Sequence, residues 1–201
     1  MNYLAHAYLS FNHPQIIVGN MISDFVKGAS KLSFSGNIQK GITLHRAIDE
    51  YTDTHPVTKK AKKIFQPHYR LYSGAIVDVL YDHFLANDPF VFDEVSLKEF
   101  TGIIYRHLED HTAHLPNKFL QAFTYMRIED WLYHYKNKEG IQKSLSGLIR
   151  RATYLSESQT AYKLFLENYN DLNYYYDEFI GDVKLFAKEK LEELVSINDT
   201  V

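Results

Sequence analysis

Apolar side chains recur at intervals of three and four residues along nearly the whole chain, and alternating apolar and polar residues are almost absent. The segment 117–137 shows the pattern, with Phe119, Phe123 and Met126 on one face. Such spacing lines up apolar residues on one side of an α-helix, whereas a half-buried strand needs a period of two. The sequence therefore predicts an all-α fold.

Prolines, glycines and capping residues mark where the predicted helices begin and end. Pro14 suits the first turn of a helix, and Pro56 should end the helix that precedes it. We expect helices over residues 2–10, 14–28 and 36–53, a lysine-rich helix that runs to Tyr69, a helix that contains Asp78 to His83 and stops before Asn87, and further helices over 96–113, 117–137, 140–154, 158–167 and 171–195.

The length of 201 residues is enough for one domain with a substantial core. No repeat, low-complexity tract or long linker divides the chain. We therefore predict a single helical bundle over 1–201. The residues that carry chemistry concentrate in 1–90, and 91–201 is expected to supply supporting helices.

Composition excludes several classes of function. The chain has no cysteine, so disulfides, thiolate nucleophiles and thiolate metal ligands are absent. A net charge of -3 gives no overall attraction to nucleic acid. No apolar run approaches the roughly 20 residues that span a bilayer, and the first residues lack signal-peptide features. We expect a cytoplasmic protein without membrane insertion or a nucleic-acid partner.

The helix predicted over 36–53 carries a column of His45, Asp49 and Asp53 at four-residue steps. One such step moves a side chain about 6 Å along the axis and about 40° around it, so His45 and Asp49 can reach one ion. Asp53 lies about 12 Å from His45 along the axis, and would serve a second ion, a hydrogen bond to a ligand or the helix end. The alternative is a helix face on which His45 is hydrogen-bonded and Asp49 pairs with a cation.

A second set, Asp78, Asp82 and His83, repeats the four-residue step. Asp78 lies between two pairs of aliphatic residues, where a carboxylate is costly to bury without a partner. A divalent cation would supply that partner. The alternative is a structural acid and a hydrogen-bonded core histidine.

Asn20 and Asp24 form a third pair four residues apart. Gly19 precedes them, and a glycine inside a helix costs about 1 kcal/mol relative to alanine, so it indicates close approach of a ligand or a second helix. His6, on the apolar first helix, is either a hydrogen-bonded buried histidine or a further ligand.

Carboxylates and imidazoles without thiolates favour Mn²⁺ or Mg²⁺, with Fe²⁺ and Zn²⁺ as alternatives. Such an ion lowers the pKa of a water molecule and polarises a phosphoryl oxygen, and Arg46 beside His45 could neutralise a phosphate. Neither a nucleophile-elbow motif nor a phosphate-binding glycine loop occurs in the sequence. Metal-assisted hydrolysis is therefore the favoured chemistry.

Five segments in the first ninety residues resemble the acyl carrier protein phosphodiesterase family. They are Asn2–His6, Gly19–Gly28, Gly41–Asp49, Thr52–Pro56 and Asp78–Leu85. The resemblance implies an all-helical fold related to the HD-domain phosphohydrolases, with Mn²⁺ as the ion. The implied reaction is hydrolysis of the phosphodiester that joins 4'-phosphopantetheine to a serine of acyl carrier protein.

Carried onto this chain, the resemblance implies metal ligands at Asp24, His45, Asp49, Asp78 and Asp82 and a phosphate contact at Arg46. The usual histidine–aspartate pair of HD domains is reversed here as Asp82 and His83, so either of these could bind metal. Either could also transfer a proton.

A run of four lysines, Lys59, Lys60, Lys62 and Lys63, is either a solvated helix face or a docking surface. Acyl carrier proteins are acidic, so this run would steer one toward the metal site. Two alternative functions are also compatible with the sequence. One is a phosphohydrolase of the same fold that acts on a nucleotide or another small phosphate ester, and the other is a non-catalytic helical module that binds an acidic protein.

Overall fold

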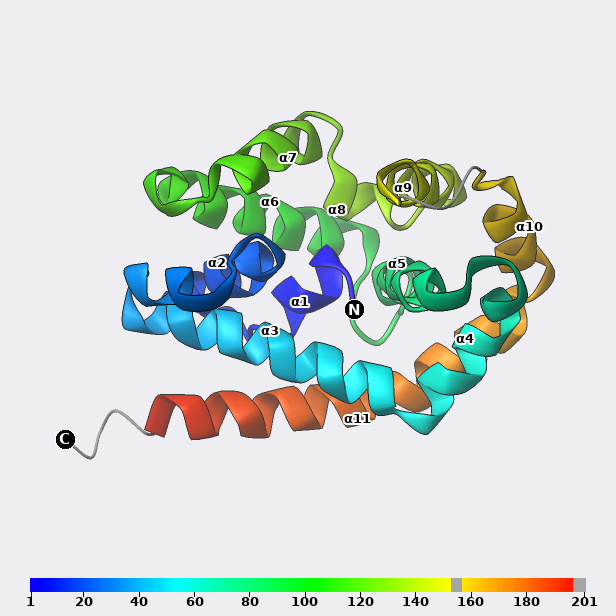
Figure 1. The fold of residues 1–201 in the computed structure, drawn as a ribbon, viewed down its shortest axis with the longest axis horizontal. Coiled ribbons are helices and arrows are strands. Elements are labelled where there is room, and N and C mark those ends of the chain that lie inside the picture. Colours follow the sequence, from blue (N-terminus) through cyan, green and yellow to red (C-terminus); the bar gives the residue numbers. More distant parts are fainter. Residues whose placement is uncertain (153–156, 197–201) are drawn as a thin grey trace.

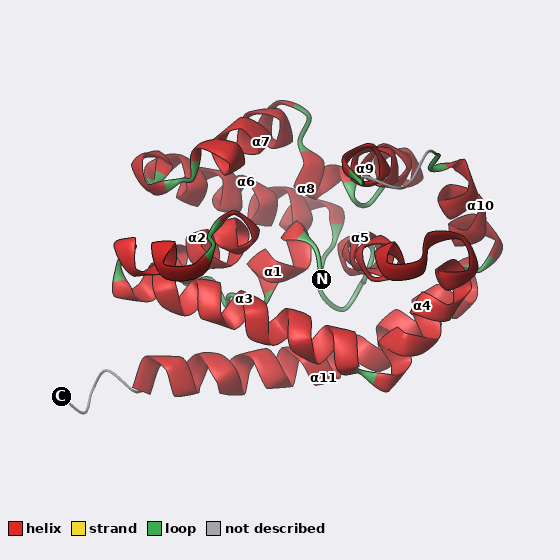
Figure 2. Cartoon of the chain, in the orientation of Figure 1, coloured by secondary structure: helices red, strands yellow, loops and turns green. Residues whose placement is uncertain are grey.

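The computed structural model describes residues 1–152 and 157–196, and these residues form helices and connecting turns without a strand (Figure 2). The all-α prediction is confirmed. The helices are α1 (Tyr3–Tyr8), α2 (Pro14–Ile22), α3 (Gly36–Thr54), α4 (Pro56–Tyr69), α5 (Ser73–Ala86), α6 (Glu94–Asp110), α7 (Asn117–Ile128), α8 (Trp131–His134), α9 (Lys138–Arg151), α10 (Gln159–Glu167) and α11 (Tyr169–Ser196), and the 3₁₀ turns are η1 (Ser23–Phe25), η2 (Gly28–Ser33), η3 (Arg70–Tyr72) and η4 (Thr112–His114).

The short helix α1 lies in the middle of the molecule, with α2, α3, α5 and α6 around it (Figure 1). Its Leu4, Ala5 and Ala7 are fully buried, because a helix surrounded by others has no solvated face. The long helices α3 and α11 pack side by side along one edge. The first residues of the chain are therefore held at the centre of the helices that carry the predicted ligands.

Two glycines set the closest helix contact, between α2 and α3. A Cβ on Gly19 would lie 2.1 Å from the carbonyl oxygen of Ile38, and a Cβ on Gly41 would lie 2.3 Å from that of Ile16. Only glycine leaves room for backbones at this separation. Of the two expectations for Gly19, close approach of a second helix is confirmed, and it brings the backbone of α2 within reach of side chains on α3.

Two predicted helices are wrong in extent. The helix expected over 14–28 ends at Ile22, where the chain enters the turn η1. The helix expected over 117–137 breaks at Asp130, whose φ of 49° is left-handed. The hydroxyl of Tyr105 accepts a hydrogen bond from the Leu132 N–H at 3.0 Å and donates one to the Met126 carbonyl at 3.3 Å, and so satisfies backbone groups on both sides of the break.

The other predicted helices agree with the structure to within a few residues. In the helix predicted over 140–154, positions 153 and 154 lie outside the described residues. No described helix has the length and apolar character needed to cross a bilayer. The relation to HD-domain proteins and the division of roles at residue 90 stay predictions.

Candidate metal centre

His45 on α3 is oriented by α2. Its Nδ1 lies 2.7 Å from the backbone carbonyl oxygen of Asn20 and 3.1 Å from the side-chain Oδ1 of the same residue. A carbonyl oxygen can only accept, so Nδ1 carries the proton. The Asn20 amide is fixed in turn, because its Nδ2 donates to the His6 carbonyl and to the Ser10 hydroxyl, each at 3.0 Å. Nε2 of His45 is left to face the site.

Two carboxylates face that nitrogen. Nε2 of His45 lies 3.2 Å from Oδ1 of Asp24 and 3.1 Å from Oδ2 of Asp49. The three groups attract one another only if Nε2 carries a proton or a cation lies between them. Burial lowers the pKa of His45, but the hydrogen bonds to Asp24 and Asp49 outweigh this effect and raise the pKa to about 9. Without a metal, His45 is therefore an imidazolium between two carboxylates.

His6 on α1 completes the cluster. Its Nε2 lies 3.1 Å from Oδ1 of Asp49, and its ring stacks on the His45 ring with 3.8 Å between centroids. Burial, followed by repulsion from His45, lowers the pKa of His6 to about 4, so its ring is neutral at physiological pH. Its Nδ1 is buried and has no hydrogen-bond partner among the residues that the structure describes. A neutral imidazole that faces a carboxylate is the form that binds a metal ion.

Ligand atoms of His6, His45 and Asp49 all lie within 4.8 Å of one another. Burial raises the pKa of Asp49, but hydrogen bonds from His45 and His6 hold this pKa well below its usual range. The donor set of two ring nitrogens and one ionised carboxylate suits a divalent transition ion. The residues present therefore fit the predicted metal.

Asp24 and Asp78 lie at the two sides of this cluster. The Asp24 side chain is 71% exposed, so it can move onto an ion or a substrate. Asp78 accepts a hydrogen bond at 2.9 Å from the Met1 α-ammonium group, which also lies 3.5 Å from Asp49. Asp78 is thus connected to the cluster through a buried cation. We expect Asp24 to be the more available of the two.

Asp82 has backbone partners instead of a place in the cluster. Its Oδ1 accepts hydrogen bonds from the N–H groups of Asn2 at 3.3 Å and Ala5 at 3.1 Å, and its Oδ2 accepts one from Leu4 at 2.7 Å. These are unpaired donors at the N-terminus of α1, so Asp82 caps that helix from α5. Burial raises the pKa of Asp82 to about 7, and the N–H donors of Leu4 and Ala5 oppose this shift.

His83 also has protein partners at both ring nitrogens. Nδ1 lies 2.7 Å from the carbonyl oxygen of Tyr135 and donates to it, so Nε2 accepts from the Tyr169 hydroxyl at 3.0 Å. The ring is 2% exposed and contacts Phe84 and Phe165 edge to face. The structure does not bring Asp82 or His83 together with the three clustered ligands, and a metal or proton-transfer role for either stays a prediction.

The remaining predicted residues lie outside the cluster. Asp53, one helical turn beyond Asp49, pairs with Lys62 at 2.6 Å. Arg46 is exposed, and its Nη2 donates to the Val26 carbonyl at 3.0 Å. Lys59, Lys60 and Lys63 are exposed on α4.

Sequence reasoning missed two groups beside the site. One is the α-ammonium of Met1, whose pKa rises to about 10 because attraction to Asp78 and Asp49 outweighs the effect of burial. The other is Tyr3, whose pKa rises to about 12 through burial and the nearby charge of Asp24. Neither belongs to a spacing pattern, so their roles depend on how α1 is placed.

Most of the chain is similar to proteins of one family. A family model described as acyl carrier protein phosphodiesterase matches residues 1–183. The acyl carrier protein phosphodiesterase of Yersinia pestis is 32% identical over 174 residues, which cover 86% of this chain and 90% of that protein. That of Photorhabdus laumondii is 30% identical over 180 residues, which cover 89% and 91%. No solved structure is significantly similar. This chain belongs to the acyl carrier protein phosphodiesterase family.

Proposed function

We propose that this protein is a metal-dependent phosphodiesterase that removes 4'-phosphopantetheine from holo acyl carrier protein and leaves the apo form. The observation that carries the proposal is the cluster of His6, His45 and Asp49, in which the Nε2 atoms of both histidines face the same Asp49 carboxylate. The family relatives, which bear the name of this activity, supply the substrate.

Within the proposal, His6, His45 and Asp49 hold a divalent ion, with Asp24 and Asp78 able to add a carboxylate from either side. When bound, the ion supplies charge neutralisation for a phosphoryl oxygen and a water of lowered pKa. The chain's own contribution is orientation. Asn20 keeps the His45 proton on Nδ1, and so keeps Nε2 available, as is usual for metal-binding histidines. We propose Mn²⁺, with Mg²⁺, Fe²⁺ and Zn²⁺ as alternatives.

Arg46 follows His45 in sequence and is exposed at the edge of the same helix. Its guanidinium now bonds a backbone carbonyl, which is a weak partner for a cation that can bind a phosphate with two hydrogen bonds. We assign Arg46 to the phosphodiester, where it would stabilise the negative charge of the substrate and of the transition state.

The lysines of α4 are the proposed docking surface for the acidic carrier protein. Lys62 is held to Asp53, four residues beyond Asp49 on α3, so the basic helix is continuous with the face of α3 that bears the cluster. Lys59, Lys60 and Lys63 are exposed and form no ion pair with any residue that the structure describes. Charges of this kind raise the rate of encounter with an oppositely charged partner.

The decisive experiment is incubation of the purified protein with holo carrier protein and Mn²⁺, followed by mass spectrometry of the carrier. We expect loss of the phosphopantetheine mass and appearance of the apo form, with no reaction in the presence of a chelator. A panel of nucleotides and small phosphate esters is the control for substrate class. Hydrolysis of a compound in that panel, with the carrier protein left uncleaved, would overturn the proposed substrate. If neither the panel nor the carrier protein is hydrolysed, the proposal that the protein is an enzyme is wrong.

The docking surface has its own test. Charge reversal at Lys59, Lys60 and Lys63 should raise the KM for carrier protein and flatten its dependence on salt, without changing kcat. Charge reversal at Lys118, Lys143 and Lys188, exposed on α7, α9 and α11, is the matched control. If the variant with Lys59, Lys60 and Lys63 reversed and the control variant both keep the wild-type KM and salt dependence, the basic helix is a solvated face.

A further inference from the structure

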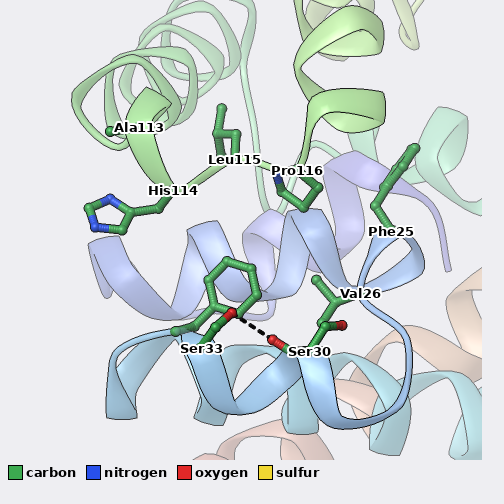
Figure 3. A pocket seen from close by; sticks show the side chains of 9 residues that line it. Phe25, Val26, Ser30, Ser33, Ala113, His114, Leu115 and Pro116 are labelled. Carbon is green, nitrogen blue, oxygen red and sulfur yellow. Dashed lines mark hydrogen bonds between the residues drawn. The ribbon is translucent and has the colours of Figure 1, made fainter.

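A pocket is lined in part by the residues that follow Asp24 in sequence. It has a volume of about 330 Å³ and lies between the chain from Phe25 to Phe34, including η2, and the segment from Ala113 to Pro116, which contains the end of η4 and leads to α7 (Figure 3). The first two lining residues, Phe25 and Val26, follow Asp24 directly in sequence. The pocket therefore begins one residue from the carboxylate that faces Nε2 of His45.

The lining combines apolar surface with hydroxyl groups. Phe25, Phe34, Leu115 and Pro116 supply the apolar part. Ser33 donates its hydroxyl to the Ser30 carbonyl at 2.8 Å, the bond drawn in Figure 3, and the Ser30 hydroxyl donates to the Lys27 carbonyl. Because both hydroxyl protons are used, each oxygen presents lone pairs that can accept from an N–H donor. The pocket suits a slender ligand with methyl and amide groups.

Two cations adjoin residues that line this pocket, since Lys31 follows Ser30 in sequence and Arg46 bonds to Val26. The Lys31 ammonium contacts the Thr43 hydroxyl at 2.5 Å, and Arg46 donates to the carbonyl of Val26, itself a lining residue. Thr43 and Arg46 are three residues apart and share a face of α3. Burial and the charge of Arg46 lower the pKa of Lys31. Neither Lys31 nor Arg46 forms an ion pair with a carboxylate among the residues that the structure describes. Two neighbouring cations without an acid favour an anion between them.

We propose that this pocket binds the pantetheine arm of the substrate, with Lys31 acting beside Arg46 on the phosphate at the mouth of the pocket. The inference rests on the proposed function, because it takes the identity of the arm from there. In this arrangement the phosphodiester lies at the metal centre, the carrier protein leaves toward α4, and the arm leaves toward η2. The geminal methyl groups contact the rings, and the amide N–H groups meet the serine oxygens.

A second pocket, of about 620 Å³, serves as the rival location. Its lining includes Tyr8, Phe90, Ile180 and Lys184, and it lies between the α5–α6 connection and α11. Phe90 is almost fully exposed there. None of its lining residues is adjacent in sequence to Asp24, Asp49 or Arg46, so an arm bound there would not begin at the cluster.

The test is a titration of the ¹⁵N-labelled protein with pantetheine, which has no phosphate and needs no turnover. We expect amide shifts at Ser30, Ser33, Ala113 and Leu115. Ser33→Trp should fill the pocket and weaken binding by at least about tenfold. Ala29→Trp places the same bulk at an exposed neighbour that does not line the pocket, and is the matched control.

A kinetic arm separates this inference from the proposed function. Both Ser33→Trp and Lys31→Ala should raise the KM for holo carrier protein. Metal-dependent hydrolysis of bis(p-nitrophenyl) phosphate, which has no pantetheine arm, should be unchanged in Ser33→Trp. Pantetheine shifts that fall around Asn87 and Gly181, or no shifts at all, would overturn the pocket even if the carrier protein is cleaved. Failure to cleave the carrier with pantetheine bound at η2 would instead count against the proposed reaction alone.

Discussion

Helices α3 and α5 carry almost the same chemical pattern but use it differently. Each has acids at a four-residue step with a histidine beside them. On α3, His45 and Asp49 lie close to His6, whose Nδ1 has no hydrogen-bond partner within residues 1–152 and 157–196. On α5, Asp82 accepts three backbone N–H groups, and both ring nitrogens of His83 are hydrogen-bonded. Spacing predicts which side chains share a face, and only their partners show whether the face is free for a ligand.

The different exposures of the two sets agree with this reading. Asp49 is 41% exposed and Asp24 is 71% exposed, whereas Asp82 is fully buried. A fully buried carboxylate whose lone pairs accept backbone donors stabilises the fold. A partly open carboxylate beside a neutral imidazole can exchange its partner for a cation. From this comparison we propose a metal-binding role for His45 and Asp49 on α3 and an anchoring role for Asp82 and His83 on α5.

The largest expected effect is on metal binding. Asp49→Asn or His45→Ala should weaken Mn²⁺ binding and the hydrolysis of a phosphodiester by well over about 100-fold, because the loss of a ligand exceeds the 10–100-fold typical of a group that only orients one. Calorimetric metal titration checks this. Asp53→Asn, on the same column but paired with Lys62, is the control and should bind normally. Equal losses in all three variants would contradict the assignment.

Asp82→Ala tests the anchoring role. Removal of the acceptor leaves the N–H groups of Asn2, Leu4 and Ala5 unpaired and should lower the free energy of unfolding by about 2 kcal/mol. Denaturant unfolding of the metal-free protein measures this loss. A variant of unchanged stability that no longer binds Mn²⁺ would show that Asp82 is a ligand and that the contrast between α3 and α5 is mistaken.

His83→Leu is the corresponding test for the histidine on α5. The Tyr135 carbonyl and the Tyr169 hydroxyl each lose a partner, and we expect a loss of about 1.5 kcal/mol in stability. The activity of each folded molecule should be that of the wild type at a temperature well below the melting point. If the variant is as stable as the wild type but has a strongly reduced kcat, the result would instead support the predicted proton-transfer role of His83.

The pKa of His45 predicts how the cluster responds to pH. This pKa is raised from 6.5 to about 9 in the metal-free fold, so a metal ion must displace a proton below pH 9. Apparent affinity should therefore fall by about tenfold for each pH unit below 9, with about one proton released. Calorimetry in buffers of different ionisation enthalpy counts that proton. Affinity independent of pH from 7 to 9 would contradict a protonated His45.

The raised pKa of His45 also predicts how the stability of the metal-free protein depends on pH: it should be greater at low pH, where metal binding is weaker. Because the folded-state pKa exceeds the unfolded one, the stabilisation from the imidazolium is complete below pH 6.5 and is lost as pH rises through about 9. Thermal unfolding in the presence of a chelator should show this decline. His45→Gln is the control and should remove it.

Much of the fold was predictable because helical periodicity is a local property. The helices at Gly36–Thr54 and Ser73–Ala86 agree with prediction, and Gly19 correctly indicated a close approach. The break at Asp130 was not predictable, because the aromatic stripe continues past it in register. What favours the break is the hydroxyl of Tyr105, which comes from a helix more than twenty residues earlier.

The site divides in the same way. Residue types and spacing predicted His45, Asp49 and Asp24 as ligands of a cation held by nitrogen and oxygen, and the structure places these three side chains together. The sequence could not show which of His6 and Asp82 faces Asp49, because spacing along one helix does not reveal partners on another helix. Tertiary structure decided this: α1 enters the centre of the molecule, presents its unpaired N–H groups to Asp82, and turns its one imidazole toward Asp49. Hydrogen-bond partners distant in sequence determine which buried polar groups are satisfied, so the choice between anchor and ligand belongs to the folded chain.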